Sequence, residues 1–233
     1  MLIKDAIFLI TGGSSGIGKS TAKLLIGLGA KVAITGLDKN KLQKVAKEIG
    51  AFPIHANVQN DPDIQHSFDS VLSEYGKLDV LINNAGIGVH KPIEALSRAD
   101  YESIFQTNVF GMAMMSQKAS EIFKAQGGGT IINIGSTSGL SGYKTGAVYS
   151  ASKFAVRGLT QCLQAELRPY NIRVMLVNPS EVPTAFGNEQ RVERPDQDKK
   201  ITSAEIAHTI VSTLSMDDRG MIPEVTVWAT NPW

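Results

Sequence analysis

The glycine-rich segment near the N-terminus limits the possible folds of this chain more than any other feature. Residues 6–10 (AIFLI) form a short apolar run typical of a buried strand, and residues 11–18 (TGGSSGIG) follow directly. From residue 19 to 28 apolar side chains recur at helical spacing, and Gly29 supplies a stop signal. Strand, glycine-rich turn and helix in this order bring backbone N–H groups and the positive end of a helix dipole to one point, where a pyrophosphate can bind. An ordinary strand–helix connection is the alternative, which the flanking elements disfavour.

Short apolar runs alternate with helical patterns along the rest of the chain, as in βαβ units of a parallel sheet. Strands are expected at residues 6–11, 31–35, 52–56, 80–83, 129–134, 172–178 and 224–228. Helices are expected at residues 18–28, 39–49, 62–75, 98–125, 148–167 and 203–215. Right-handed crossovers then give an α/β fold, a Rossmann-like doubly wound parallel sheet of about seven strands with helices on both faces. No linker or repeat divides the chain, so residues 1–233 are expected to form a single domain.

Composition argues against several classes of function. The formal net charge of +1 gives no reason to expect nucleic acid or an anionic membrane as a partner. No apolar run is long enough to span a bilayer, and the chain leads directly from Met1 into a strand, so a cytoplasmic location is expected. The single cysteine, Cys162, is expected to pack in the core or at an interface. The four histidines show no metal-ligand spacing, and metal catalysis is not expected.

A second motif places a phenol and an ammonium group one helical turn apart. Tyr149 and Lys153 are four residues apart in an expected helix, so their side chains share a face. A free phenol has a pKa of roughly 10, and a nearby cation favours the phenolate and lowers this pKa. The pair is therefore suited to exchanging a proton with a substrate oxygen, although the same spacing also occurs on solvated helix faces.

The glycine turn, residues 83–86 (NNAG), Asn108, Ser136 and the Tyr149/Lys153 pair together resemble the short-chain dehydrogenase/reductase family in order and spacing. Ser136 lies 13 residues before Tyr149, as the family expects. The resemblance implies that Tyr149 is the general acid in carbonyl reduction and the base in alcohol oxidation, and that Ser136 and Tyr149 bind the substrate oxygen. It implies that Lys153 lowers the tyrosine pKa and binds the nicotinamide ribose. It also implies that Asn108 anchors the water of a proton relay, so an active catalyst is expected.

The same resemblance, which runs from about residue 3 to 184, implies a nicotinamide dinucleotide as cofactor. The residues expected to bind it lie in the glycine turn, at three strand ends, in the NNAG segment and on the catalytic helix: Gly12, Ser14, Ser15, Gly16, Ile17, Gly18, Gly36, Leu37, Asn57, Val58, Asn84, Ala85, Gly86, Tyr149, Lys153, Pro179, Val182 and Thr184. Asn57 stands where the family usually has Asp beside the adenine, and it still offers an acceptor oxygen.

The choice between NAD(H) and NADP(H) depends on the end of the second strand. Members that use NAD have an acidic residue at the position of Gly36, and members that use NADP often have Arg at the position of Leu37, so both markers are absent. Without an acidic residue nothing repels a 2′-phosphate, which favours NADP(H) over NAD(H). Asp38 could instead reach a ribose hydroxyl, and Lys39 or Lys41 a 2′-phosphate, or each could be an ordinary charge at a helix start.

Residues 184–200 are expected to form a loop that covers the substrate, because the longest irregular charged stretch (187–200) lies there, after a strand end. A solvated surface loop is the alternative. Ser180 stands where the family usually has Gly. Candidate pocket residues are of mixed polarity: Leu140, Gly142, Tyr143, Thr184 and Phe186. His90, just beyond the NNAG segment, could face the substrate cleft or the solvent.

The expected substrate is a small-molecule carbonyl or secondary alcohol, of the hydroxy-acid/keto-acid type or a small ketone. A 3-oxoacyl-carrier-protein reductase is the near alternative, and a non-catalytic dinucleotide-binding sensor is the alternative of another class. A sugar epimerase or dehydratase usually needs a larger C-terminal domain. Relatives commonly assemble as tetramers or dimers through the helices that carry Asn108 and Tyr149, so the resemblance implies a homo-oligomer.

Overall fold

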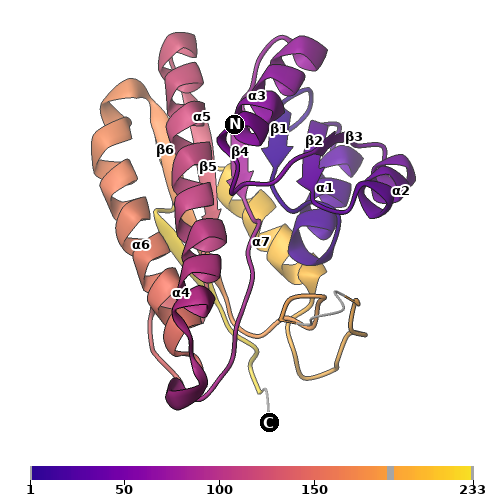
Figure 1. Cartoon of the computed structure of the whole chain (residues 1–233). Helices are drawn as coiled ribbons and strands as arrows, with labels where there is room; N and C mark the ends of the chain where they lie inside the picture. The colour runs from indigo at the N-terminus through magenta and orange to yellow at the C-terminus, as the bar shows by residue number, and fades with distance from the viewer. Residues whose placement is uncertain (1, 188–191, 232–233) are drawn as a thin grey trace.

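The computed structural model describes residues 2–187 and 192–231, which contain one seven-stranded sheet (Figure 1). Its strands are β1 (Ile7–Ile10), β2 (Lys31–Gly36), β3 (Phe52–His55), β4 (Val80–Asn83), β5 (Gly129–Ile134), β6 (Ile172–Pro179) and β7 (Glu224–Val227). They lie in the order β3-β2-β1-β4-β5-β6-β7, and every neighbouring pair is parallel. The predicted parallel sheet is confirmed. Its order reverses between β1 and β4, the switch point at which ligands bind in such sheets.

Helices cover both faces of the sheet, as predicted. Helices α1 (Gly16–Gly27), α2 (Lys39–Ile49) and α7 (Ser203–Leu214) pack on one face, and α3 (Asp61–Tyr75), α5 (Met112–Gln126) and α6 (Ala147–Leu167) on the other. Figure 1 shows α5 beside α6, and α1 contacts α7. Three short 3₁₀ helices, at Ile93–Ala95, Thr137–Gly139 and Arg168–Tyr170, lie in the connections.

The core has two layers because successive strand residues point to opposite faces of the sheet. In β1, Phe8 and Ile10 pack with α1 and α2, whereas Ile7 and Leu9 pack with α3 and α5. All four side chains are buried, so the strand is apolar at every position, as expected of a parallel sheet covered on both faces. The apolar runs in the sequence therefore located the strands to within one or two residues.

The helix predicted at residues 98–125 is not α-helical throughout. Helix α4 (Arg98–Phe105) begins with a capping box between Ser97 and Asp100, and a π-helix at Gln106–Gly111 separates it from α5. A π turn inserts one residue without breaking the apolar pattern, so periodicity does not reveal it; such turns are frequent at functional sites. At Gly111 the segment passes so close to the chain after β3 that a Cβ would lie 2.7 Å from the Val58 carbonyl oxygen.

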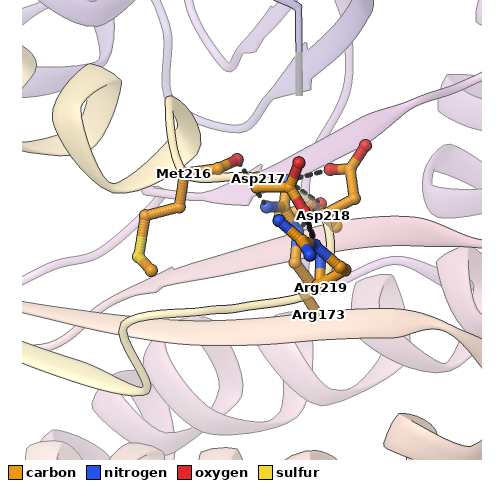
Figure 2. A network of polar contacts seen from close by, with 6 residues as sticks. Arg173, Met216, Asp217, Asp218 and Arg219 are labelled. Carbon is orange, nitrogen blue, oxygen red and sulfur yellow. Dashed lines mark hydrogen bonds and ion pairs between the residues drawn. The ribbon is translucent and has the colours of Figure 1, made fainter.

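Arg173 joins the beginning of β6 to the connection between α7 and β7 (Figure 2). Its Nε and Nη2 each donate to Thr130 Oγ1 over 3.2 Å, and its Nη1 donates to the Met216 carbonyl oxygen over 3.4 Å. Asp218 lies 3.4 Å from Nη2. Because Thr130 and Arg173 stand near the amino ends of their strands, the network lies at the edge opposite the ligand-binding edge, where it ties the connection after α7 to β5 and β6.

The side chain of the single cysteine lies on the surface of a helix. Cys162 is exposed on α6, so its predicted place in the core is wrong: it lies next to Leu163, which packs against the core, and successive helical residues point about 100° apart.

Within the described ranges, no helix is both long and apolar enough to cross a bilayer.

Replacing Gly18 by alanine should destabilise the protein, whereas the same change at Gly27 should not. A Cβ at position 18 would lie 2.5 Å from Asn84 Nδ2 and 2.6 Å from the Gly12 carbonyl oxygen, but a Cβ at position 27 has no atom within 4 Å. Overpacking typically costs about 1–3 kcal/mol, more than the gain of up to about 1 kcal/mol from helix propensity. Urea unfolding of both variants measures the difference, and equal stabilities would contradict the close contact between α1 and the glycine turn.

Candidate active site

A cavity of about 590 Å³ lies at the carboxyl edge of the sheet, where β1 and β4 are neighbours. Of the residues predicted to bind the cofactor or to act in catalysis, all except Gly18 and Asn108 line it. Sequence reasoning missed several further lining residues, which lie in the turn before α3 and in the segment of α4 and the π-helix: Gln59, Ser103 and Thr107. The structure therefore gathers segments from most of the chain around one cavity.

Hydrogen bonds join the glycine turn after β1 to the turn after β4. Thr11 Oγ1 accepts from the backbone N–H groups of Asn84 and Ala85, at 3.0 and 2.9 Å. The Asn84 amide donates in turn to the carbonyl oxygens of Thr11 and Gly12, at 2.9 and 3.1 Å. Gly18 packs behind this joint, which explains why it does not line the cavity. Asn84 thus shapes the cavity through backbone contacts.

The N-terminus of α1 has the properties of an anion site. Gly12 and Gly16 have φ angles of +65° and +50°, in the left-handed region that favours glycine. The first turn of α1 contains no acidic residue, and the side chain of the N-cap, Ser15, makes no capping hydrogen bond. Since the first N–H groups of a helix have no partners within the helix, those facing the cavity can bind a phosphate.

Tyr149 and Lys153 are both buried on the cavity side of α6, with 8% and 6% of their surfaces exposed. Tyr149 shares a hydrogen bond with the Ser136 side chain. Ser136 Oγ also accepts from the Ser138 backbone N–H at 3.1 Å. Because that N–H uses a lone pair of Oγ, the Ser136 proton is free to be donated towards the phenol or a substrate oxygen.

Burial controls the pKa values of both groups. Desolvation raises the pKa of Tyr149 to about 12, against the lowering effect of the Ser136 hydrogen bond. Desolvation also lowers the pKa of Lys153 to about 8. The predicted lowering of the tyrosine pKa by the lysine does not appear as a net effect in this structure, because desolvation has the larger effect: Lys153 Nζ lies 5.8 Å from the Tyr149 ring centre and donates to the Ile134 carbonyl oxygen at 2.8 Å.

Asn108 lies behind the cavity, on the π-helix, and is 2% exposed. Its Nδ2 donates to the Ile87 carbonyl oxygen at 2.9 Å and to Ser152 Oγ at 3.1 Å, and its Oδ1 accepts from the Ile87 N–H at 2.9 Å. Both N–H donors of the amide are therefore used within the protein. A water held by Asn108 must bind to the remaining lone pair of Oδ1 or to the main-chain carbonyl.

The cavity near Gly36 has little room and no acidic group. A Cβ at Gly36 would lie 3.0 Å from Ser14 Oγ, and Leu37, half exposed, lines the cavity beside it. Asp38 caps α2 by accepting from the Lys41 N–H at 3.0 Å, which favours the interpretation of an ordinary charge at a helix start. Asn57 Oδ1 accepts from the Gln59 N–H at 3.0 Å and so shapes the turn after β3.

Aromatic side chains surround Tyr149 at the outer end of the cavity. The ring centres of His90 and Phe186 lie 5.7 and 5.5 Å from that of Tyr149. His90 Nδ1 is hydrogen-bonded to the Tyr143 hydroxyl at 2.8 Å. Of the candidate pocket residues, Thr184 and Phe186 line the cavity, whereas Leu140, Gly142 and Tyr143 do not.

The described part of the segment 184–200 contacts the glycine turn. Glu193 bridges two backbone N–H groups, that of Gly16 at 2.9 Å and that of Ala185 at 3.1 Å. Arg194 Nε donates to the Thr184 carbonyl oxygen at 2.9 Å. Residues 188–191 of the predicted lid lie outside the described residues. Glu193 belongs to the charged stretch predicted to cover the site, but no sequence pattern predicted its contact with Gly16, 177 residues away.

Comparison with known proteins identifies the family. The model of the short chain dehydrogenase family matches residues 6–195. The chain belongs to this family. Among curated relatives, secoisolariciresinol dehydrogenase of Forsythia intermedia is 38% identical over 192 residues, which cover 80% of this chain and 69% of the relative. An uncharacterized oxidoreductase of Staphylococcus aureus strain N315 is 31% identical over 229 residues, 97% of this chain and 98% of the relative.

Solved structures support the same assignment. An alcohol dehydrogenase of the archaeon Thermococcus sibiricus, complexed with 5-hydroxy-NADP, matches with a TM-score of 0.89, 25% identity and 97% coverage of both chains. A 3-ketoacyl-(acyl-carrier-protein) reductase of Brucella melitensis, complexed with NADH, matches with a TM-score of 0.87, 29% identity and coverage of 99% of this chain and 100% of that chain. The protein is thus a short-chain dehydrogenase/reductase, an oxidoreductase of a family that uses nicotinamide dinucleotides. In the described part of the chain, no three His, Cys, Asp or Glu side chains are placed to hold a metal ion.

The stability of the dinucleotide-free dehydrogenase should rise with pH between about pH 8 and 10 because of Lys153. In this window the folded protein has released the Lys153 proton, whose pKa is lowered to about 8 from 10.5, while the unfolded chain still holds it. The full difference between these two pKa values corresponds to a gain on the order of 3 kcal/mol in the free energy of unfolding, which is lost as the pH falls through 8. Urea unfolding from pH 7.5 to 9.5 should show this rise in the wild type.

Lys153→Met should remove the rise, while Lys124→Met, on the exposed face of α5, should keep it. The window ends below pH 10 because Tyr149, with its raised pKa, contributes the opposite slope above that value. If the stability of Lys153→Met rises with pH as steeply as that of the wild type, the buried amine does not titrate in this range.

Proposed function

We propose that this enzyme interconverts a carbonyl and a secondary alcohol, with Tyr149 as the general acid and base. The observation that carries the proposal is the placement of Ser136, Tyr149 and Lys153 together on one wall of a cavity that also contains the phosphate-binding end of α1. The dinucleotide, when bound, supplies or accepts the hydride. The residues of the cavity fit this group: the left-handed glycines and the α1 N-terminus for the pyrophosphate, and Lys153 for the nicotinamide ribose.

The protonation states favour carbonyl reduction at neutral pH. With a pKa of about 12, Tyr149 holds its proton at pH 7 and is ready to donate it to the oxygen of a carbonyl. Ser136 donates a hydrogen bond to the same oxygen. Lys153, whose pKa is about 8, is still mainly a cation at pH 7, and it stabilises negative charge that develops on the phenol oxygen. Asn108 holds the water that returns a proton to this group.

NADP(H) is the proposed cofactor, in preference to NAD(H). Within the described residues no Asp or Glu lines the cavity, so nothing there repels a 2′-phosphate near Gly36 and Leu37. The solved relatives named above include one complexed with 5-hydroxy-NADP and one with NADH, so the family is compatible with either. Parallel assays with NADPH and NADH decide between them.

The proposed substrates are small molecules of the hydroxy-acid/keto-acid type or small ketones, with 3-oxoacyl-carrier-protein reduction as the alternative suggested by one structural relative. We also propose a homo-oligomer. Phe110, Met114 and Phe154, from the segment of Asn108 and from the helix of Tyr149, are 51%, 40% and 46% exposed, and exposed apolar side chains of this kind favour self-association. A cytoplasmic location stays an expectation from the sequence.

Tyr149→Phe should bind the dinucleotide as the wild type does and lose roughly 10²–10⁴-fold in turnover, the usual contribution of a positioned acid–base group. The assay follows nicotinamide absorbance with NADPH or NADH against keto acids, ketoesters, diketones and aldehydes, and the affinity is measured separately by fluorescence. Tyr170→Phe, at the far end of α6, is the control and should keep full activity. Retained turnover in Tyr149→Phe would rule out the proposed role of Tyr149. If the wild type itself binds the dinucleotide but turns over no carbonyl, the result would favour a non-catalytic sensor.

Residues 184–200 are proposed to act as a lid, with Glu193 as its contact to the glycine turn. The Glu193 carboxylate joins Gly16, in the cofactor cradle, to Ala185, at the root of the loop. Glu193 does not line the cavity, whereas both of its partners do, so the contact leaves the cavity open for the dinucleotide. A charged hydrogen-bond acceptor on a helix N-terminus is a favourable position for a closing contact.

Glu193→Ala should therefore speed the release of the dinucleotide by about 3- to 10-fold, as expected from the loss of hydrogen bonds to a partly exposed carboxylate. Stopped-flow displacement of bound NADPH measures this rate. Glu181→Ala is the matched control, because Glu181 accepts from Lys200 of the same loop at 2.6 Å and, among the described residues, has no hydrogen bond with the glycine turn. Tighter dinucleotide binding in Glu193→Ala would contradict the lid contact and would show that the carboxylate competes with the phosphate.

A further inference from the structure

A histidine–tyrosine pair that the reaction scheme does not use lies beside the catalytic phenol. His90, in the chain after β4, and Tyr143, in the chain before α6, are joined by the hydrogen bond between Nδ1 and the hydroxyl at 2.8 Å, although they are 53 residues apart. The two rings are 6.0 Å apart, and the His90 ring stands edge-on to Tyr149 at 5.7 Å. Both members of the pair are thus held at the entrance to the catalytic group.

The ring nitrogen of His90 can donate or accept in this hydrogen bond according to its tautomer, and we assign Tyr143 as the donor. The Ser138 side chain lies within reach of the Tyr143 hydroxyl and can donate to its oxygen. The Tyr143 proton is then available to His90 Nδ1, which accepts it only when Nδ1 carries no proton. Partial burial lowers the pKa of His90, which favours the same neutral ring. In a neutral imidazole whose Nδ1 accepts, the proton is on Nε2.

The Nε2–H group lies next to the cavity. His90 Nε2 is 3.2 Å from the Cβ position of Gly88 and 3.5 Å from that of Gly187, and both glycines line the cavity. The Phe186 ring lies 2.8 Å from the same Cβ position of Gly88, so the donor and this ring stand side by side. Over residues 2–187 and 192–231, no hydrogen bond of the Nε2–H group is found. It is a donor without a partner, beside the wall that carries Tyr149.

We propose that His90 binds a second oxygen atom of the substrate, apart from the carbonyl that reacts, and that Tyr143 positions His90 for this contact. The inference rests on the proposed function and, of the two substrate types proposed there, favours small ketones over keto acids. The second oxygen is uncharged, as in a diketone, a ketoester or a hydroxyketone, because a carboxylate would favour a cation as its partner. Lys153 is the one Lys or Arg among the described lining residues, and it is directed to the Ile134 carbonyl.

A pair of substrates that differ in this oxygen tests the proposal. Ethyl 3-oxobutanoate and heptan-2-one have main chains of the same length, and the first carries further oxygen atoms beyond its ketone. The wild type should prefer the ketoester. His90→Phe should lower kcat/KM for the ketoester by about 10-fold or more, mainly through KM, because a neutral hydrogen bond is lost, and should change the value for heptan-2-one by less than about 3-fold.

His90→Gln, which keeps an N–H donor, should recover part of the preference, and Tyr143→Phe should reduce it without abolishing turnover. His66→Phe, on the exposed side of α3, is the control. An equal loss with both substrates in His90→Phe would overturn the proposal, since it would mean that His90 only supports the ring of Tyr149.

A measurement without turnover separates this proposal from the proposed function. In ¹⁵N NMR of the imidazole rings, with His90 assigned from its absence in His90→Gln, Nε2 should carry the proton and Nδ1 should not. Addition of ethyl 3-oxobutanoate to the complex with NADP⁺ should shift the Nε2 signal, and heptan-2-one should not. A proton on Nδ1, or equal shifts, would overturn the role of His90. Failure of the wild type to reduce any carbonyl would instead count against the proposed function.

Discussion

The joint between Thr11 and Asn84 is the contact on which the rest of the site depends. A parallel sheet leaves a crevice where its strand order reverses, but the two turns that border the crevice are free to splay unless something holds them together. Here the side chain of each turn bonds the backbone of the other, with four contacts of 2.9–3.1 Å. The glycine turn is therefore held against residues 84–86, and α1 begins at a fixed place relative to β4.

The same rigidity extends to the catalytic side through Asn108. Its amide holds the backbone of Ile87, three residues beyond Asn84, and also bonds Ser152, which lies next to Lys153 on α6. The π-helix places this amide between the two segments. Hydrogen bonds on either side of the backbone of residues 85–87 thus connect the phosphate cradle to the helix that carries the proton donor. Proton transfer and hydride transfer need positions fixed to a fraction of an ångström, which these contacts supply.

The resemblance to the family predicted most of the cavity lining. Sequence patterns alone predicted the sheet, the glycine turn and the Tyr149/Lys153 pair, because these depend on local signals: apolar runs, glycines at a turn, and a Tyr and a Lys one helical turn apart. They failed where a long-range contact decides. The raised pKa of Tyr149 follows from burial by distant segments, which outweighs the effect of the neighbouring lysine. The contacts of Glu193 with Gly16 and of His90 with Tyr143 span 177 and 53 residues, and no spacing in the sequence predicts them. The π-helix adds one residue to a turn and leaves the apolar periodicity nearly unchanged.

The two ends of the cavity are built from different chemical groups. This explains why the sequence indicated the residues of the cofactor end but not the contacts of the substrate end. At the cofactor end, backbone N–H groups and glycines make the contacts, and a dinucleotide needs the same groups whatever the substrate is. Glu193 takes the first N–H of α1, and among the described residues no group accepts from the N–H of Ile17, which leaves it for a phosphate. At the substrate end, side chains of three separate loops meet around Tyr149. Because loops fold against one another only in the complete structure, the chemistry of that end follows from their contacts, above all from the hydrogen bond between His90 and Tyr143.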